Sequence, residues 1–106
     1  MDLFGSRTRT RILIYLALAE ESYVAEMASA LGDSKLTIQR ILRALEDLGV
    51  VASRLRGRVR LVSLDKTWYA AAELRALLQR MSAADEDALT AAASVRRRPR
   101  RPGKPL

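Results

Sequence analysis

The sequence predicts a small, mainly α-helical domain that carries one β-hairpin, with three helices before the hairpin and one additional helix after it. Apolar residues recur at the i, i+3, i+4, i+7 spacing of helices in residues 24–48 and again in 68–81. Between these stretches, residues 51–64 hold two runs of strand-forming residues around a glycine. A chain of 106 residues has room for one such domain, which we assign to residues 1–82, followed by a tail over 83–106.

The first helix is predicted over residues 7–20, because the Ser6 hydroxyl can accept a hydrogen bond from an amide of the first turn. Residues 12–19 are all apolar. A helix that is apolar on every side needs cover on every side. We therefore expect this helix to contact its own domain on one face and a second element or a second subunit on the other.

The next two helices are predicted to be joined by a turn of three residues. The second helix is expected over residues 24–31, after which Gly32 permits a left-handed exit. Asp33 or Ser34 then caps a third helix, which ends at Gly49. One face of this third helix is apolar and is expected to pack on the core, whereas the opposite face carries basic and polar side chains.

The hairpin is predicted to turn at Arg56-Gly57-Arg58, where the glycine suits a tight turn. If this loop contains three residues, Arg54 and Arg60 lie directly opposite each other in the ladder. Like charges in that position are destabilising. The arrangement makes better sense if an anion lies beside the hairpin.

The fourth helix is predicted over residues 68–81, with Asp65 or Thr67 as its cap. Its apolar side chains follow helical spacing and form one face. Trp68 lies off this face, and we expect it to pack onto the hairpin or the first helix.

The charge of the chain indicates anionic partners. With 19 basic and 12 acidic residues the formal net charge is +7, which favours DNA, RNA, an anionic membrane or an acidic protein. Six of the basic residues lie in residues 96–106, a proline-rich segment that we expect to be disordered and to add nonspecific affinity. The remaining charges nearly balance, so the folded part depends on where its basic residues lie.

The absence of cysteine and histidine from the sequence removes disulfides, thiolate chemistry and the two commonest transition-metal ligands. No glycine-rich phosphate loop occurs either. We therefore expect no metal, no cofactor and no enzymatic activity.

The start of the chain imitates a short secretory signal, with basic residues followed by an apolar run and Ala17-Leu18-Ala19. The run is short and overlaps its own cleavage site. No stretch approaches the roughly 18–20 apolar residues that span a bilayer. We therefore expect a cytoplasmic protein that is not associated with a membrane.

Three segments carry a family resemblance: LFGSRTRTRIL, then YVAEMASALGDSKLTIQRILRALEDLGVV, then SRLRGRVRLVSL. Together they closely resemble the winged helix-turn-helix regulators of the ArsR and MarR type, over residues 3 to about 64. The resemblance implies a three-helix core with a hairpin wing, and homodimers that bind operator DNA. Metal sensing in ArsR proteins depends on cysteines and histidines, so that function is not implied here.

The resemblance implies three sets of site residues. The third helix would contact base edges or backbone through Ser34, Lys35, Leu36, Thr37, Gln39, Arg40 and Arg43. The wing would contact phosphates or a minor groove through Arg54, Arg56, Gly57, Arg58 and Arg60. The first and last helices would form much of the dimer interface through Ile14, Leu18, Leu74, Leu77, Leu78 and Met81.

The chemistry of the third helix supports these roles independently. Gln39 can pair bidentately with adenine, Arg40 or Lys35 with guanine, and Leu36 can lie against a thymine methyl group. The sequence thus predicts a sequence-specific regulator that binds double-stranded DNA, which we expect to be a repressor. Two alternatives remain open: a winged-helix protein-interaction module, which would bury Leu36 and Trp68 in its partner, and a protein that coats DNA without sequence preference.

Overall fold

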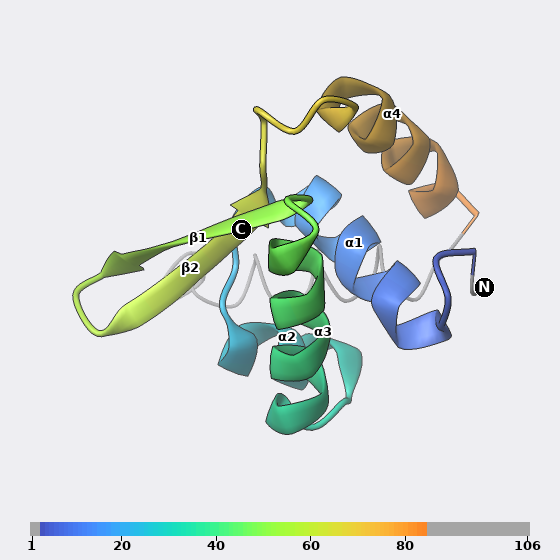
Figure 1. Ribbon diagram of the computed structural model, residues 1–106. Helices are drawn as coiled ribbons and strands as arrows, with labels where there is room; N and C mark the ends of the chain where they lie inside the picture. The colour runs from blue at the N-terminus through green and yellow to red at the C-terminus, as the bar shows by residue number, and fades with distance from the viewer. Residues whose placement is uncertain (1–2, 85–106) are drawn as a thin grey trace, which may run out of the picture.

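Three helices, an antiparallel hairpin and a fourth helix follow one another in the computed structural model, which describes residues 3–84 (Figure 1). The helices and strands are α1 (Arg7–Ala19), α2 (Val24–Leu31), α3 (Lys35–Asp47), β1 (Val51–Arg56), β2 (Val59–Leu64) and α4 (Ala71–Ser82). The arrangement is mainly α and winged-helix-like, which confirms the predicted fold class. Residues 85–106 of the predicted tail lie outside the described residues.

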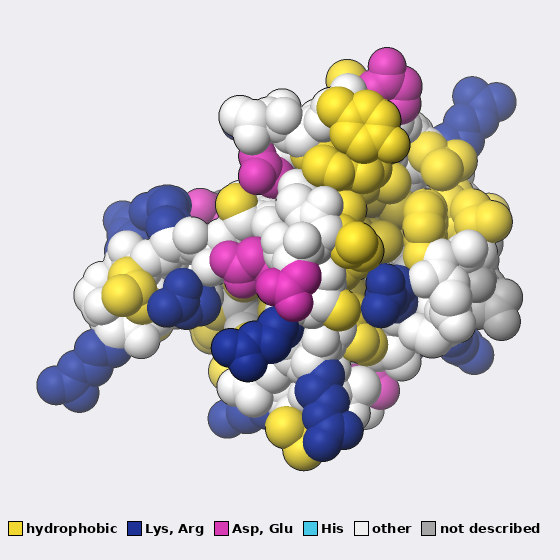
Figure 2. Space-filling view, in the orientation of Figure 1, with side chains coloured by type: hydrophobic (Ala, Val, Ile, Leu, Met, Phe, Trp, Pro, Cys, Tyr) yellow, Lys and Arg dark blue, Asp and Glu magenta, His cyan; other side chains and the backbone are white. Residues whose placement is uncertain are grey.

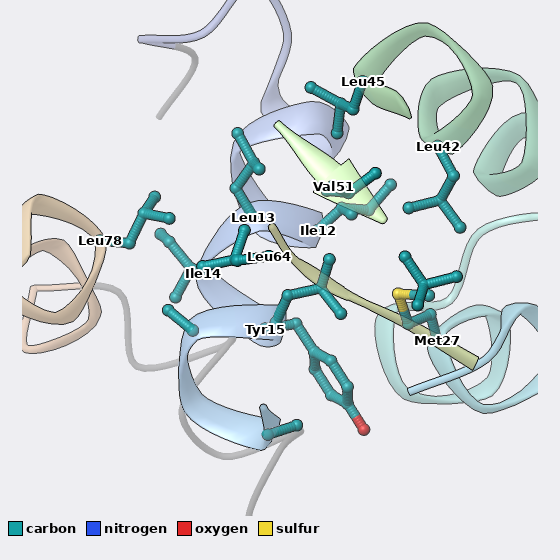
Figure 3. Packing of buried hydrophobic residues seen from close by; sticks show 14 of the residues in the cluster. Ile12, Leu13, Ile14, Tyr15, Met27, Leu42, Leu45, Val51, Leu64 and Leu78 are labelled. Atoms are coloured by element: carbon teal, nitrogen blue, oxygen red, sulfur yellow. The ribbon is translucent and has the colours of Figure 1, made fainter. Parts of the chain in front are cut away.

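Helix α1 lies at the centre of the core. In Figure 3, Leu78 of α4 lies near Ile14, whereas Leu42 and Met27 lie on the other side of α1. The apolar residues of α1 are therefore covered by elements of the same chain, with α4 on one side and α2 and β2 also packed against the helix.

This packing corrects part of the predicted dimer interface. Ile14 and Leu78 are both 0% exposed, so neither side chain is accessible to a second subunit. The apolar residues 12–19 of α1 suggested an intermolecular contact, but α4 supplies the missing cover within the chain. Burying these two side chains contributes to the folding of a single chain.

Backbone groups at the helix ends form hydrogen bonds with side chains, some from neighbouring residues and some from other helices. The hydroxyl of Ser6 accepts a hydrogen bond from the Arg9 amide (3.0 Å), as predicted for the start of α1. Helices α1 and α2 have no basic residue in their own last turns. Instead, Arg75 of α4 donates to the Ala17 carbonyl (3.5 Å) and Arg11 of α1 donates to the Leu31 carbonyl (3.4 Å). Each arginine places positive charge at the negative end of a neighbouring helix.

The hairpin turns over two residues, not three. Gly57 has φ +63° and begins a two-residue connection of the kind that favours glycine at its first position. Consequently Arg54 pairs with Leu61 and Arg60 pairs with Leu55. The predicted Arg54–Arg60 pair is therefore wrong, and the two arginines lie on opposite faces of the hairpin.

The base of the hairpin is fixed to the connection between α1 and α2. Ser22 forms an isolated antiparallel bridge with Val62. The Ser22 amide donates to the Val62 carbonyl (3.0 Å), and the Val62 amide donates to the Ser22 carbonyl (2.7 Å). Toward its tip the hairpin extends away from the helices (Figure 1).

Helix α4 begins at Ala71, three residues later than predicted. Asp65 caps a local turn instead of the helix, because its Oδ1 accepts from both the amide (2.8 Å) and the hydroxyl (2.7 Å) of Thr67. These two bonds, the side-chain bond first, lower the pKa of the Asp65 carboxyl below its ordinary value. Since the folded pKa is the lower one, the resulting stabilisation is present at neutral pH and is lost as the pH falls through it.

Trp68 is partly buried against the core and covers Gly49, at the junction of α3 and β1. A β-carbon at Gly49 would lie 3.4 Å from Cδ1 of the indole, and the glycine has φ +85°. Trp68 thus packs against the core, as a residue expected to lie on the hairpin or the first helix would, and it lies next to the start of the hairpin. None of the helices described here is long and apolar enough to cross a bilayer.

Candidate functional site

Helix α3 divides into a buried and an exposed face, as its sequence predicted. Ile38, Leu42 and Leu45 are buried in the core. The exposed face carries the predicted contact residues Lys35, Leu36, Thr37, Gln39, Arg40 and Arg43. Leu36 is 55% exposed although it is apolar, so the first turn of α3 presents an aliphatic side chain between polar ones.

The start of α3 is held by Ser34. Its hydroxyl accepts a hydrogen bond from the Thr37 amide (3.1 Å) and donates one to the Thr37 hydroxyl (2.9 Å). The predicted site residues Ser34 and Thr37 are therefore engaged with each other while remaining exposed. The positive end of the helix dipole lies beside Lys35, which makes this end of α3 attractive to anions.

A groove lies between α3, the start of α2 and one face of the hairpin. Helix α3 contributes Gln39, Arg40 and Arg43, and the hairpin contributes Arg58 and Arg60. Residues predicted from two separate segments are thus brought to the two walls of one concave surface. The structure also places Glu46 and Ser53 in this groove, which the sequence reasoning did not identify.

The four predicted wing arginines do not form one set. Arg54 and Arg56 lie on the hairpin face opposite Arg60, because side chains alternate along a strand. Arg54 is ion-paired with Glu21 of the α1–α2 connection, with 2.9 Å between Nη2 and Oε2. Its Nε also donates to the same carboxylate oxygen at 3.1 Å.

Arg60 takes part in a chain of hydrogen bonds inside the groove. Its Nη1 donates to the Ser53 hydroxyl (3.1 Å), and that hydroxyl donates to Oε2 of Glu46 (3.0 Å). Glu46 continues the exposed stripe of α3 at the spacing 39, 43, 46, and this spacing could have predicted its place in the groove. The place of Ser53 could not be predicted without the register of the strands.

Several cations at the site have no partner in the part of the chain that the structure describes. Among the described residues, no hydrogen bond or ion pair engages the charged groups of Lys35, Arg40, Arg43, Arg56 or Arg58. Figure 2 shows Lys and Arg side chains over the lower, N-terminal end of α3 and along the hairpin, with acidic side chains nearer the other end of α3. The acidic end corresponds to Glu46 and Asp47, so the exposed face is polarised along the helix.

The remaining predicted interface residues differ in their accessibility. Leu18, Leu74 and Met81 are partly buried against the core, whereas Leu77 is 43% exposed. Apolar side chains extend across the surface around α4 in Figure 2, where Tyr69 is also 90% exposed. Of the six residues predicted for the interface, Leu77 is the most accessible.

No group of three or more His, Cys, Asp or Glu residues within 3–84 is arranged to hold a metal ion. The site is thus a grooved surface with cations and hydrogen-bonding side chains. Comparison of the chain with protein-family models, curated proteins and solved structures found no match.

Proposed function

We propose that this protein binds double-stranded DNA sequence-specifically and acts as a transcriptional regulator, as a repressor, on the nucleoid in the cytoplasm. One observation carries the proposal: cations from α3 and from the hairpin, which have no partner within residues 3–84, flank a single groove that also presents Gln39. Acidic residues are available nearby, yet these cations do not pair with them. A row of phosphates would supply the missing counter-charges.

The proposed complex assigns different tasks to the two walls of the groove. Helix α3 enters the major groove, where Gln39 matches the edge of adenine, Arg40 matches guanine and Leu36 meets a thymine methyl group. The hairpin follows the adjacent backbone, with Arg56 and Arg58 near its tip as phosphate contacts. The acidic end of α3 stays outside the major groove of the DNA, because phosphates repel Glu46 and Asp47.

The test is a selection of bound sequences from random duplexes, followed by affinity measurements over a series of salt concentrations. We expect a preferred sequence and an affinity that falls steeply with salt. Arg56→Ala and Arg58→Ala should each weaken binding to every duplex and reduce the slope of log K against log salt by about one. Arg80→Ala on the exposed surface of α4 is the matched control and should change neither quantity.

Three outcomes would separate this function from its alternatives. Binding with the expected salt slope but without any selected sequence would indicate a protein that coats DNA. Failure to bind any duplex would overturn the proposal. Salt-insensitive binding to a protein, lost when Leu36 is replaced, would favour an interaction module.

The proposed regulator is a homodimer, whose two copies of α3 would contact two half-sites. Leu77 on the exposed surface of α4 is the residue we place in the interface. Sedimentation velocity at micromolar concentration should show a dimer, and Leu77→Glu should convert it to a monomer. Leu55→Glu, which changes an exposed leucine on the hairpin, should leave the dimer intact. A monomeric wild-type protein would contradict this part of the proposal.

A further inference from the structure

Two carboxylates hold the hairpin from its two faces. On the groove face, Glu46 of α3 accepts a hydrogen bond from Ser53 of β1, which in turn accepts one from Arg60 of β2 (3.0 and 3.1 Å). On the opposite face, Glu21 of the α1–α2 connection binds Arg54 of β1 (2.9 Å). Ser53 and Arg54 are adjacent in the middle of β1, so both contacts hold the hairpin at the same position along its length.

We propose that Glu21, Glu46 and Ser53 are positioning residues that set the angle between the hairpin and α3 for DNA binding. In this arrangement Arg54 and Arg60 brace the hairpin, and Arg56 and Arg58 remain available to phosphates. The inference rests on the proposed function. It replaces the view that all four wing arginines are equivalent contacts.

The architecture explains why such braces are needed. A two-stranded hairpin has little stability or stiffness by itself. Its backbone is anchored at the base by the Ser22–Val62 bridge, and the tip residues from Arg54 to Arg60 are all exposed. The Ser53 and Arg54 contacts lie between the anchored base and the tip, where they can restrict bending toward or away from the groove.

The ion pair is better suited to orientation than to stability. The Arg54 and Glu21 side chains are 56% and 38% exposed, and ion pairs with that exposure add little to the free energy of unfolding. The ion pair orders the hairpin before DNA binds, so less conformational entropy is lost when the complex forms. The Ser53 hydroxyl also restricts the hairpin, because it donates its one proton to Glu46 and accepts a hydrogen bond from Arg60.

The proposal predicts a change in DNA affinity opposite to the one that charge alone predicts. Removing an acidic residue beside a DNA site should strengthen binding if only charge matters. If Glu46 positions the hairpin, Glu46→Ala should weaken binding to the selected duplex instead. Asp47 provides the matched control, since it is the adjacent exposed acidic residue and its carboxylate makes no hydrogen bond or ion pair within residues 3–84.

The experiment measures affinity for the selected duplex and its salt slope for full-length variants. Glu46→Ala and Ser53→Ala should each weaken binding by about two- to tenfold, which corresponds to one side chain that must now be ordered on binding. The double variant should be no weaker than either single one, because both changes break the same chain of bonds. Glu46→Gln keeps an oxygen that can accept from Ser53 and should not weaken binding, and Asp47→Ala should leave it unchanged or strengthen it.

Arg54→Ala tests the opposite face. It should weaken binding without reducing the salt slope, whereas Arg56→Ala should reduce the slope by about one. Equal slope changes for the two variants would show that Arg54 contacts phosphate and would overturn its role as a brace. If wild-type protein binds DNA and both Ser53→Ala and Glu46→Ala bind as well as it does, the positioning role is wrong while the proposed function stands. If wild-type protein binds no duplex, both are wrong.

Discussion

Leu78→Ala is expected to lower the free energy of unfolding by about 2–5 kcal/mol, the usual cost of removing a fully buried leucine side chain. Leu78 is 0% exposed and joins α4 to the core near Ile14 (Figure 3). Because α1 is apolar on every side, a cavity here also uncovers part of the central helix. The loss is a large fraction of the roughly 5–15 kcal/mol that stabilises a typical domain.

Denaturant titration of a buried and an exposed leucine measures this effect. Leu55→Ala on the hairpin, outside the proposed dimer interface, is the matched control, and its cost should be clearly smaller because that side chain is 63% exposed. Trp68, the single tryptophan, lies just before α4 and reports on the docking of this helix by its fluorescence. Equal costs for the two substitutions would mean that α4 is not part of the cooperative core.

The elements that could be predicted from the sequence are those with local causes. Helical spacing and the glycines at 32 and 49 defined α2 and α3, and Ser6 and Ser34 cap their helices as expected. The turn of the hairpin was predicted one residue too long, because Arg56 can end a strand as well as enter a loop. That single residue changed the faces on which Arg54 and Arg60 lie.

Tertiary contacts decided the features that could not be predicted. The residues just before α4 form a turn in which Asp65 bonds to Thr67, and Trp68 lies over Gly49, far from it in the sequence. The cover of α1 by α4 joins helices separated by the whole hairpin.

Some residues of the candidate site could likewise be predicted from local spacing, whereas others depend on tertiary contacts. Helical periodicity alone placed Gln39, Arg40 and Arg43 on one exposed face. The contact between Glu21 and Arg54 spans 33 positions, and the one between Glu46 and Ser53 depends on how β1 leaves α3. Neither contact has a signature in local spacing.

For DNA recognition, Arg40→Ala is expected to have the largest effect on sequence preference. A bidentate contact between an arginine and guanine discriminates by about 1–3 kcal/mol, so affinity for the selected duplex should fall roughly five- to 150-fold. Affinity for a scrambled duplex should fall much less. Repeating the selection with the variant should show lost preference at one base position, and the same design with Gln39→Ala should affect a different one.

Arg40→Lys distinguishes base reading from simple charge attraction. Lysine keeps the positive charge but lacks the planar pair of donors that matches guanine. If Arg40 reads a base, this variant should keep the salt slope and the affinity for scrambled DNA while losing much of the preference for the selected sequence. If Arg40 contacts a phosphate instead, Arg40→Lys should resemble the wild-type protein in all three measurements, and base reading by α3 would have to depend on Gln39 and Lys35.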